Sequence, residues 1–205
     1  MEQSQGRTRN LRENCVQEAL AIIEEEGVEQ LSLRDVARRL GVSHQAPYKH
    51  FPSRDHLLAE IVSRAFIAFA RHLDSRHRSE NPHEDLAAMG RAYLDYAREH
   101  PLQYWLMFGT PLPDPGLHPE MMRSAQHAFS LLRDCLKRMF ADGQTGLGNV
   151  ELNALFVWST MHGLASILQT SAIDTLALPP DILEAMAPHV LKQIGAALEA
   201  ELGAP

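Results

Sequence analysis

Helical periodicity is the feature that most constrains how this sequence can fold. Along its 205 residues, apolar side chains recur three or four positions apart, and no segment shows convincing strand-like alternation between turn signals. Leu57, Ile61 and Ala65, for example, share one side of a helix. The sequence therefore predicts an all-α fold. Turn residues divide it into about nine helices, near residues 7–26, 33–40, 43–50, 54–73, 83–99, 101–109, 119–141, 150–170 and 180–201.

Composition changes along the chain indicate how the helices are grouped. A polar stretch at 74–83 and a proline-rich stretch at 111–119 interrupt the helical pattern. The fourth helix, at 54–73, precedes the first interruption and is long enough to bridge two domains. We therefore expect a small N-terminal domain over residues 1–55 and a larger helical domain over residues 56–205.

Charge does not exclude nucleic acid as a partner, although the net charge is −7. Residues 1–55 hold eight Lys and Arg against nine Asp and Glu, so this part of the chain is nearly neutral. Phosphate binding depends on a local basic patch and not on the overall charge. The sequence therefore leaves room for a DNA-binding surface in the first domain.

No apolar segment in the sequence is long enough to span a bilayer, and the first ten residues have no apolar run behind their charges. We therefore expect a cytoplasmic protein. Its two cysteines, Cys15 and Cys135, each lie on an apolar helical stripe, where a thiol behaves as a small hydrophobic group. Buried, reduced thiols are the favoured interpretation over redox sensing.

Two short helices, at 33–40 and 43–50, have the dimensions of a helix-turn-helix. Ser32 is expected to cap the first, and Gly41 suits the sharp turn between them. Ser43 is expected to cap the second, which places Pro47 near its fourth position. The proline is expected to distort the first turn and to bias Ala46 away from helical angles.

The run LSLRDVARRLGVSHQAPYKHFPSRDHLLAEIV carries a resemblance to a known family. With its Tyr48-x-His50-Phe51 signature and Arg54 at the next helix, it resembles the DNA-binding domain of the tetracycline-repressor (TetR) family of transcriptional regulators. Further on, Trp158-x-x-x-His162-Gly163 resembles the WHG-type C-terminal domain of one branch of that family. The resemblance implies a DNA-binding regulator with a ligand-binding second domain, and it implies neither catalysis nor a cofactor.

The resemblance also assigns roles to residues of the first domain. It places His44, Gln45 and Ala46 near base edges, whereas Arg38 and Arg39 more simply form a solvated helix face and Phe51 belongs to the core. For His50 a phosphate contact and a structural hydrogen bond remain equally open. The complete predicted DNA-binding set is Arg7, Arg9, Arg34, Ser43, His44, Gln45, Ala46, Tyr48, Lys49, His50 and Arg54.

Large aromatic and methionine side chains face inward by periodicity in the second domain. Most of them simply form the core, but such a lining with a few polar groups is typical of a pocket for an apolar ligand. We therefore predict a small, largely apolar effector of unknown identity. The candidate effector-binding residues are Phe66, Phe69, Met89, Tyr93, Trp105, Phe108, His127, Trp158 and His162.

The last two long helices, at 150–170 and 181–198, are apolar on more than one side and therefore need more than one partner. A homodimer in which both helices and their symmetry mates form a four-helix bundle would bury the excess. Such a dimer predicts a palindromic operator in double-stranded DNA, with half-sites one helical turn, about 34–36 Å, apart.

Two other classes of protein fit the sequence less well. An all-helical enzyme or metal protein is disfavoured, because the sequence has no metal-binding His/Glu motif, no phosphate loop and no nucleophile elbow. A ligand-binding or protein-interaction module with an idle helix-turn-helix is harder to exclude, although intact Tyr48, Lys49 and Arg54 argue against it. A repressor is expected because no separate activation surface is identifiable.

Overall fold

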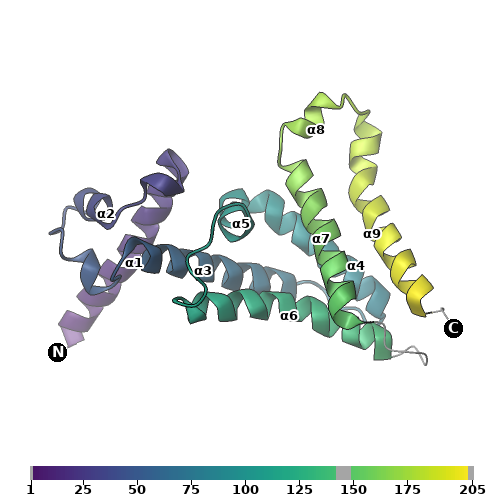
Figure 1. Ribbon diagram of the computed structural model, residues 1–205, viewed down its shortest axis with the longest axis horizontal. Helices are drawn as coiled ribbons and strands as arrows, with labels where there is room; N and C mark the ends of the chain where they lie inside the picture. Colours follow the sequence, from purple (N-terminus) through teal and green to yellow (C-terminus); the bar gives the residue numbers. More distant parts are fainter. Residues whose placement is uncertain (1, 142–148, 203–205) are drawn as a thin grey trace. The chain divides into compact units, whose positions relative to one another are not determined.

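The computed structural model describes the backbone of residues 2–141 and 149–202, and the side chains of these ranges except 2–9, 141, 172, 201 and 202. The described residues contain helices and no strand, which confirms the predicted all-α fold (Figure 1). The nine α-helices are α1 (Glu2–Glu26), α2 (Leu33–Arg39), α3 (Arg54–Asp74), α4 (Pro82–Glu99), α5 (Pro101–Phe108), α6 (Pro119–Ala141), α7 (Val150–Leu168), α8 (Ala172–Thr175) and α9 (Pro180–Leu202). Two 3-10 helices, η1 (Val28–Gln30) and η2 (Pro47–Lys49), lie between the first α-helices.

The chain forms two compact units. Unit 1 comprises residues 1–66 and 105–125, and unit 2 comprises residues 67–104 and 126–205. Helices α3, α5 and α6 therefore each contribute residues to both units. The expected domain boundary at residue 55 remains a prediction. Among the described residues, no helix is both long enough and apolar enough to cross a membrane.

Local signals near the start of unit 1 set the ends of its helices. Helix α1 ends before Gly27, whose φ of 92° is favourable for glycine. Ser32 caps α2 as predicted, because its Oγ accepts a hydrogen bond from the backbone N–H of Asp35 at 3.1 Å. Gly41 follows α2 with a φ of 65°, which allows the sharp turn.

The segment after this turn is not the α-helix that the sequence predicts. Residues 44–46 form a turn in which the Ala46 N–H donates to the Ser43 carbonyl at 2.9 Å, and η2 follows with Pro47 as its first residue. Pro47 has no N–H to donate, so an α-helical bond back to Ser43 cannot form. The expectations that Ser43 caps an α-helix and that Ala46 leaves helical angles were both wrong, since Ala46 has φ −63° and ψ −47°.

Unit 2 includes the packed helices α4, α7 and α9. Helices α7 and α9 run antiparallel and are joined through α8 (Figure 1). Helices α4 and α9 approach each other closely at Gly90 of α4, where a Cβ atom would lie 2.3 Å from Cδ2 of Leu191. At Gly163 of α7, a Cβ atom would meet nothing within 4 Å among the described residues.

Both cysteines are free and buried, as predicted. Burial raises the pKa of the Cys15 thiol. Burial, reinforced by the neighbouring Asp85 carboxylate, raises the pKa of Cys135 to about 11. Both thiols are therefore protonated at neutral pH and weak nucleophiles, in agreement with a structural role.

Candidate nucleic-acid interface and ligand-binding cluster

Most of the predicted DNA-binding side chains in unit 1 are exposed. Tyr48 is 46% exposed even though it is a large aromatic residue. Ala46 and His50 are half-buried, and the side chains of Arg7 and Arg9 lie outside the described residues. The exposed members of the predicted set are Arg34, Ser43, His44, Gln45, Tyr48 and Lys49.

Arg34 and Lys49 differ from the other cations of unit 1. Among the side chains that the structure describes there, neither forms an ion pair or a side-chain hydrogen bond, whereas the remaining Lys and Arg are all paired with carboxylates. An unpaired, exposed cation can approach a phosphate without first breaking an internal ion pair. The paired cations are Arg12, Arg38, Arg39, Arg54, Arg64 and Arg123.

Arg54 has a structural role that the sequence did not reveal. Its Nε donates to the carbonyl oxygen of Leu31 at 3.0 Å, and its Nη2 donates to the carbonyl oxygen of Val28 at 2.5 Å. The guanidinium therefore ties the start of α3 to the chain between α1 and α2. The contact between Arg54 and a DNA phosphate remains a prediction. It would have to use N–H groups of Arg54 that do not already bond these two carbonyl oxygens.

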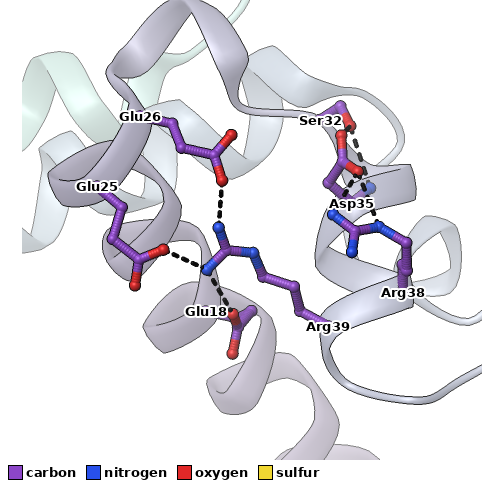
Figure 2. A network of polar contacts seen from close by, with 7 residues as sticks. All are labelled: Glu18, Glu25, Glu26, Ser32, Asp35, Arg38 and Arg39. Atoms are coloured by element: carbon purple, nitrogen blue, oxygen red, sulfur yellow. Dashed lines mark hydrogen bonds and ion pairs between the residues drawn. The ribbon is translucent and has the colours of Figure 1, made fainter.

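A network of ion pairs holds α2 against α1 (Figure 2). Arg39 reaches from α2 to three carboxylates of α1, with Glu25 at 2.7 Å, Glu18 at 3.5 Å and Glu26 in direct contact. Only 20% of the Arg39 side chain is exposed, so the expectation that it forms a solvated helix face was wrong. Arg38 fits that expectation better, because its side chain is 66% exposed and pairs with Asp35 of the same helix.

A second network joins α1 to α3 beneath the exposed segment. Arg12 lies over the ring of Phe51, 5.2 Å from its centroid, and pairs with Glu60 at 2.8 Å. Arg64 bonds the same Glu60 at 2.7 Å and also reaches Glu13. Phe51 is buried, as predicted. The residue that follows His50 is therefore anchored between α1 and α3, which fixes the end of the exposed segment 43–50.

Several predicted effector-binding residues meet in unit 2. The Tyr104 hydroxyl lies 2.6 Å from Nδ1 of His162 and 3.0 Å from the Tyr93 hydroxyl. Trp158 and Phe69 border this trio, with ring centroids 6.1 Å from His162 and 5.3 Å from Tyr93, respectively. We call Phe69, Tyr93, Tyr104, Trp158 and His162 the aromatic cluster. Its polar atoms form a connected group surrounded by rings.

Burial changes the protonation of this cluster. Burial raises the pKa of Tyr93, with the adjoining Tyr104 as a smaller cause, and burial also raises the pKa of Tyr104. Burial lowers the pKa of His162, so its imidazole is neutral at neutral pH. The cluster thus offers hydroxyl and imidazole groups without a formal charge, which suits hydrogen bonding to an uncharged polar atom of a ligand.

Other residues predicted for the effector site are not members of the aromatic cluster. Trp105 is 38% exposed and His127 is exposed, so the expectation that they face the interior was wrong. Phe66 and Phe108 contact each other in unit 1, with centroids 5.7 Å apart. Met89 is buried in unit 2. Helical periodicity places residues on a side of a helix, but it does not say whether a neighbouring helix covers that side.

Tyr104 was missing from the predicted effector set although it donates or accepts the shortest bond of the cluster. In the sequence, Tyr104 lies three residues after Pro101 and directly before Trp105, which gave little reason to prefer it to Trp105. Among the described residues, no group of three His, Cys, Asp or Glu side chains could hold a metal ion.

Two family models match the chain. "Bacterial regulatory proteins, tetR family" matches residues 16–61, and "Tetracyclin repressor-like, C-terminal domain" matches residues 86–193, which is more than half of the chain.

Individual relatives agree with these matches. The chain is 26% identical to the uncharacterized HTH-type transcriptional regulator Rv0681 of Mycobacterium tuberculosis, over 80% of this chain and 73% of the relative. It is 30% identical to the HTH-type transcriptional repressor DrrR1 of Streptomyces coeruleorubidus, over 59% of this chain and 43% of the relative. The crystal structure of the regulator FadR from Bacillus subtilis in complex with stearoyl-CoA has the same fold, with a TM-score of 0.66 at 14% identity, covering 88% of this chain and 96% of that one. The chain therefore belongs to the TetR family of DNA-binding transcriptional regulators.

Proposed function

We propose that this protein binds a palindromic operator as a homodimer, represses transcription there, and is released by a small, largely apolar effector. The observation that carries the DNA-binding part is a pair of exposed cations, Arg34 of α2 and Lys49 within the segment 43–50, which have no ion-pair partner among the described residues. Gln45 and His44 in that segment have side chains suited to base edges, and the Tyr48 hydroxyl is suited to phosphate.

The exposed apolar side of α7 supports the homodimer. Leu152, Phe156 and Ile167 are 63%, 41% and 48% exposed, and their spacing places them on one side of the helix. Gly163 lies on the same side, where its missing side chain would let a partner helix approach closely. A group of exposed apolar side chains on one side of a helix is typical of an interface between subunits.

The aromatic cluster supports an apolar effector with a polar atom. Its rings would contact the apolar part, and the Tyr93, Tyr104 and His162 group would bond the polar part. The FadR structure of similar fold is a complex with stearoyl-CoA, a molecule with a large apolar chain.

The first test is selection of bound duplexes from a random pool by the purified protein at two salt concentrations. A palindrome with fixed half-site spacing is the expected product. Recovery of no sequence above background would favour an idle helix-turn-helix and refute the proposal. The selected operator then becomes the probe with which effectors are screened by release of DNA.

Single variants then separate phosphate contacts from base contacts. Lys49→Ala should weaken binding to most duplexes and reduce the slope of log K against log salt by about one. Gln45→Ala should instead change the preferred base at one position by about 1–3 kcal/mol. Arg123→Ala is the matched control, because Arg123 is exposed in unit 1 but paired with Glu120. Equal effects of the Lys49 and Gln45 variants on every sequence would contradict these roles.

Dimerisation is tested by sedimentation velocity. Phe156→Asp should shift the protein to monomers, because an acid on the apolar side of α7 would have to be desolvated in the interface. Leu117→Asp is the control, since Leu117 is 69% exposed in unit 1 and lies outside α7. If the Phe156→Asp variant is as dimeric as the Leu117→Asp variant, the interface does not lie on this side of α7.

A further inference from the structure

Unit 2 contains a cavity lined by positively charged side chains. It has a volume of about 390 Å³ and is formed by the end of α3 with the residues after it, and by the C-terminal half of α6. This volume is within the range of pockets that hold small molecules. Its charged lining comprises the cations Arg76, Arg78, Lys137 and Arg138 and the carboxylates Asp74 and Asp134.

A buried carboxylate holds two of these cations in place. Asp85 is fully buried and accepts a hydrogen bond from Nη2 of Arg76 at 3.0 Å and another from Arg138. Nη1 of Arg76 also donates to the carbonyl oxygen of Leu73 at 2.7 Å. The four cations that line the cavity are accompanied by three carboxylates, those of Asp74, Asp134 and Asp85. This cluster of charged side chains therefore has a net positive charge. The two guanidinium groups are therefore positioned before any ligand binds.

Arg76 retains a buried donor. Its side chain is 5% exposed, and its Nε has no hydrogen-bond acceptor among the described residues. A buried donor without an acceptor is unfavourable, and such donors are rare in folded proteins. Arg138 lines the same cavity but is 48% exposed, so its guanidinium is accessible from the solvent side. Arg76 also lines the cavity, so an oxygen-bearing anion that reached its Nε would supply the acceptor that this group lacks.

Arg78 and Lys137, the other two cations that line the cavity, form only exposed ion pairs with neighbouring carboxylates. Arg78 lies in the irregular segment after α3 and pairs with Asp74 at the end of that helix, and Lys137 pairs with Asp134 at 3.2 Å, one turn away on α6. All four of these side chains are about half exposed or more. Exposed pairs at this spacing contribute little to stability. Both cations can therefore turn toward a ligand at small cost.

We propose that this cavity binds a small oxyanion, that is, a metabolite whose phosphate or carboxylate group is held by Arg76 and Arg138 and surrounded by Arg78 and Lys137. Guanidinium groups match the paired oxygens of both kinds of anion, and the ammonium group adds an adaptable charge. The site lies wholly within unit 2 and shares no residue with the aromatic cluster. It therefore gives the protein a second ligand class beside the apolar effector.

The test is calorimetric titration of the full-length protein with inorganic phosphate, pyrophosphate and citrate, each at constant ionic strength. Saturable binding of one anion per chain is expected, with a matching rise in the thermal midpoint. Tighter binding of pyrophosphate would assign a phosphate-bearing metabolite, and tighter binding of citrate a carboxylate. Absence of saturable binding by all three probes would refute the proposal.

Variants then locate the binding. The double change Arg78→Gln and Lys137→Gln should weaken the tightest probe by about tenfold or more, because it removes two of the four charges around the anion. It leaves Arg76 and Asp85 in place, so the thermal midpoint without the anion should be unchanged. The control is the double change Arg98→Gln and Arg123→Gln, which removes two exposed cations with partners one turn away. Equal weakening by the control would show diffuse charge attraction and overturn the site.

Discussion

Replacing Asp85 with asparagine should destabilise the protein far more than an ordinary change of charge. The substitution keeps the size of the side chain but removes the negative charge that Arg76 and Arg138 share. Removing one partner of a buried ion pair costs about 3–5 kcal/mol, because the other charge stays buried without compensation. Arg138 is 48% exposed and can return to water, whereas Arg76 is 5% exposed and cannot. Arg76 therefore dominates the cost.

We expect a loss of about 3 kcal/mol in the free energy of unfolding, at the lower end of that range because only one of the two arginines is trapped. For a chain of this length, each 1 kcal/mol lowers the thermal midpoint by about 2–4 °C, so a fall of roughly 6–12 °C is predicted. Urea unfolding measures the free energy, and a fixed protein concentration keeps any contribution of subunit association equal between the variants.

The matched control is Asp95→Asn. Asp95 pairs with Arg98 at 2.8 Å on the surface of the same helix, and both side chains are about half exposed or more. Loss of such a pair costs about 0–1 kcal/mol. A change at Asp85 that costs no more than the change at Asp95 would refute the view that the buried carboxylate neutralises Arg76.

Acid should reveal the same interaction. Burial favours the neutral form of Asp85, but bonds from Arg76, Cys135 and Arg138 outweigh it and hold the pKa of Asp85 below its ordinary value. A carboxyl whose pKa is lowered by folding stabilises the protein above the unfolded pKa and loses that contribution as pH falls toward the folded pKa. The wild type should therefore lose stability below about pH 4 more steeply than the asparagine variant.

Three further results are expected. Arg39→Ala should cost about 1 kcal/mol and lower DNA affinity without changing sequence preference, because α2 loses its tie to α1 at Glu25; unaltered urea unfolding and affinity would contradict this. Gly41→Ala should cost about 1–2 kcal/mol in urea unfolding from its φ of 65° alone, since its new Cβ would meet no atom within 4 Å; a neutral result would show that the turn relaxes. Because burial lowers the pKa of His162, wild-type stability should fall as pH drops from about 6.5 toward that lowered pKa, and His162→Phe should flatten the profile; parallel profiles would refute the assignment.

Helix ends were the part of the fold that the sequence predicted best. Ser32 and Gly27 are local signals, because a capping hydroxyl bonds the backbone of its own helix and a positive φ is a property of one residue. The segment 43–50 was predicted less well. Pro47 indicated a distortion, but whether the chain continues as an α-helix after it depends on the packing of its buried ring.

The exposure of the DNA-binding candidates was predicted more reliably than the surroundings of the ligand-binding ones, while the roles of both sets remain predictions. Exposed residues such as Gln45 and Lys49 need only point away from the core, and a helix-turn-helix pattern indicates which ones do. The ligand-binding candidates had to be placed relative to helices far away in the sequence. Trp105 and His127 lie on apolar helices but on sides that solvent reaches, while Tyr104 points to His162, 58 positions further along the chain.

The sequence by itself determined the all-α class, most of the helix ends, the burial of both cysteines and the family, because periodicity, caps and motifs are read from neighbouring residues. Only the tertiary structure decided which charges are already paired. Arg39 and Arg54 bond internal partners, Arg34 has no such partner among the described residues, and Arg76 lies in a buried group with Asp85. The physical reason is that an ion pair between helices depends on distances of a few ångströms, which the sequence positions of its members do not fix.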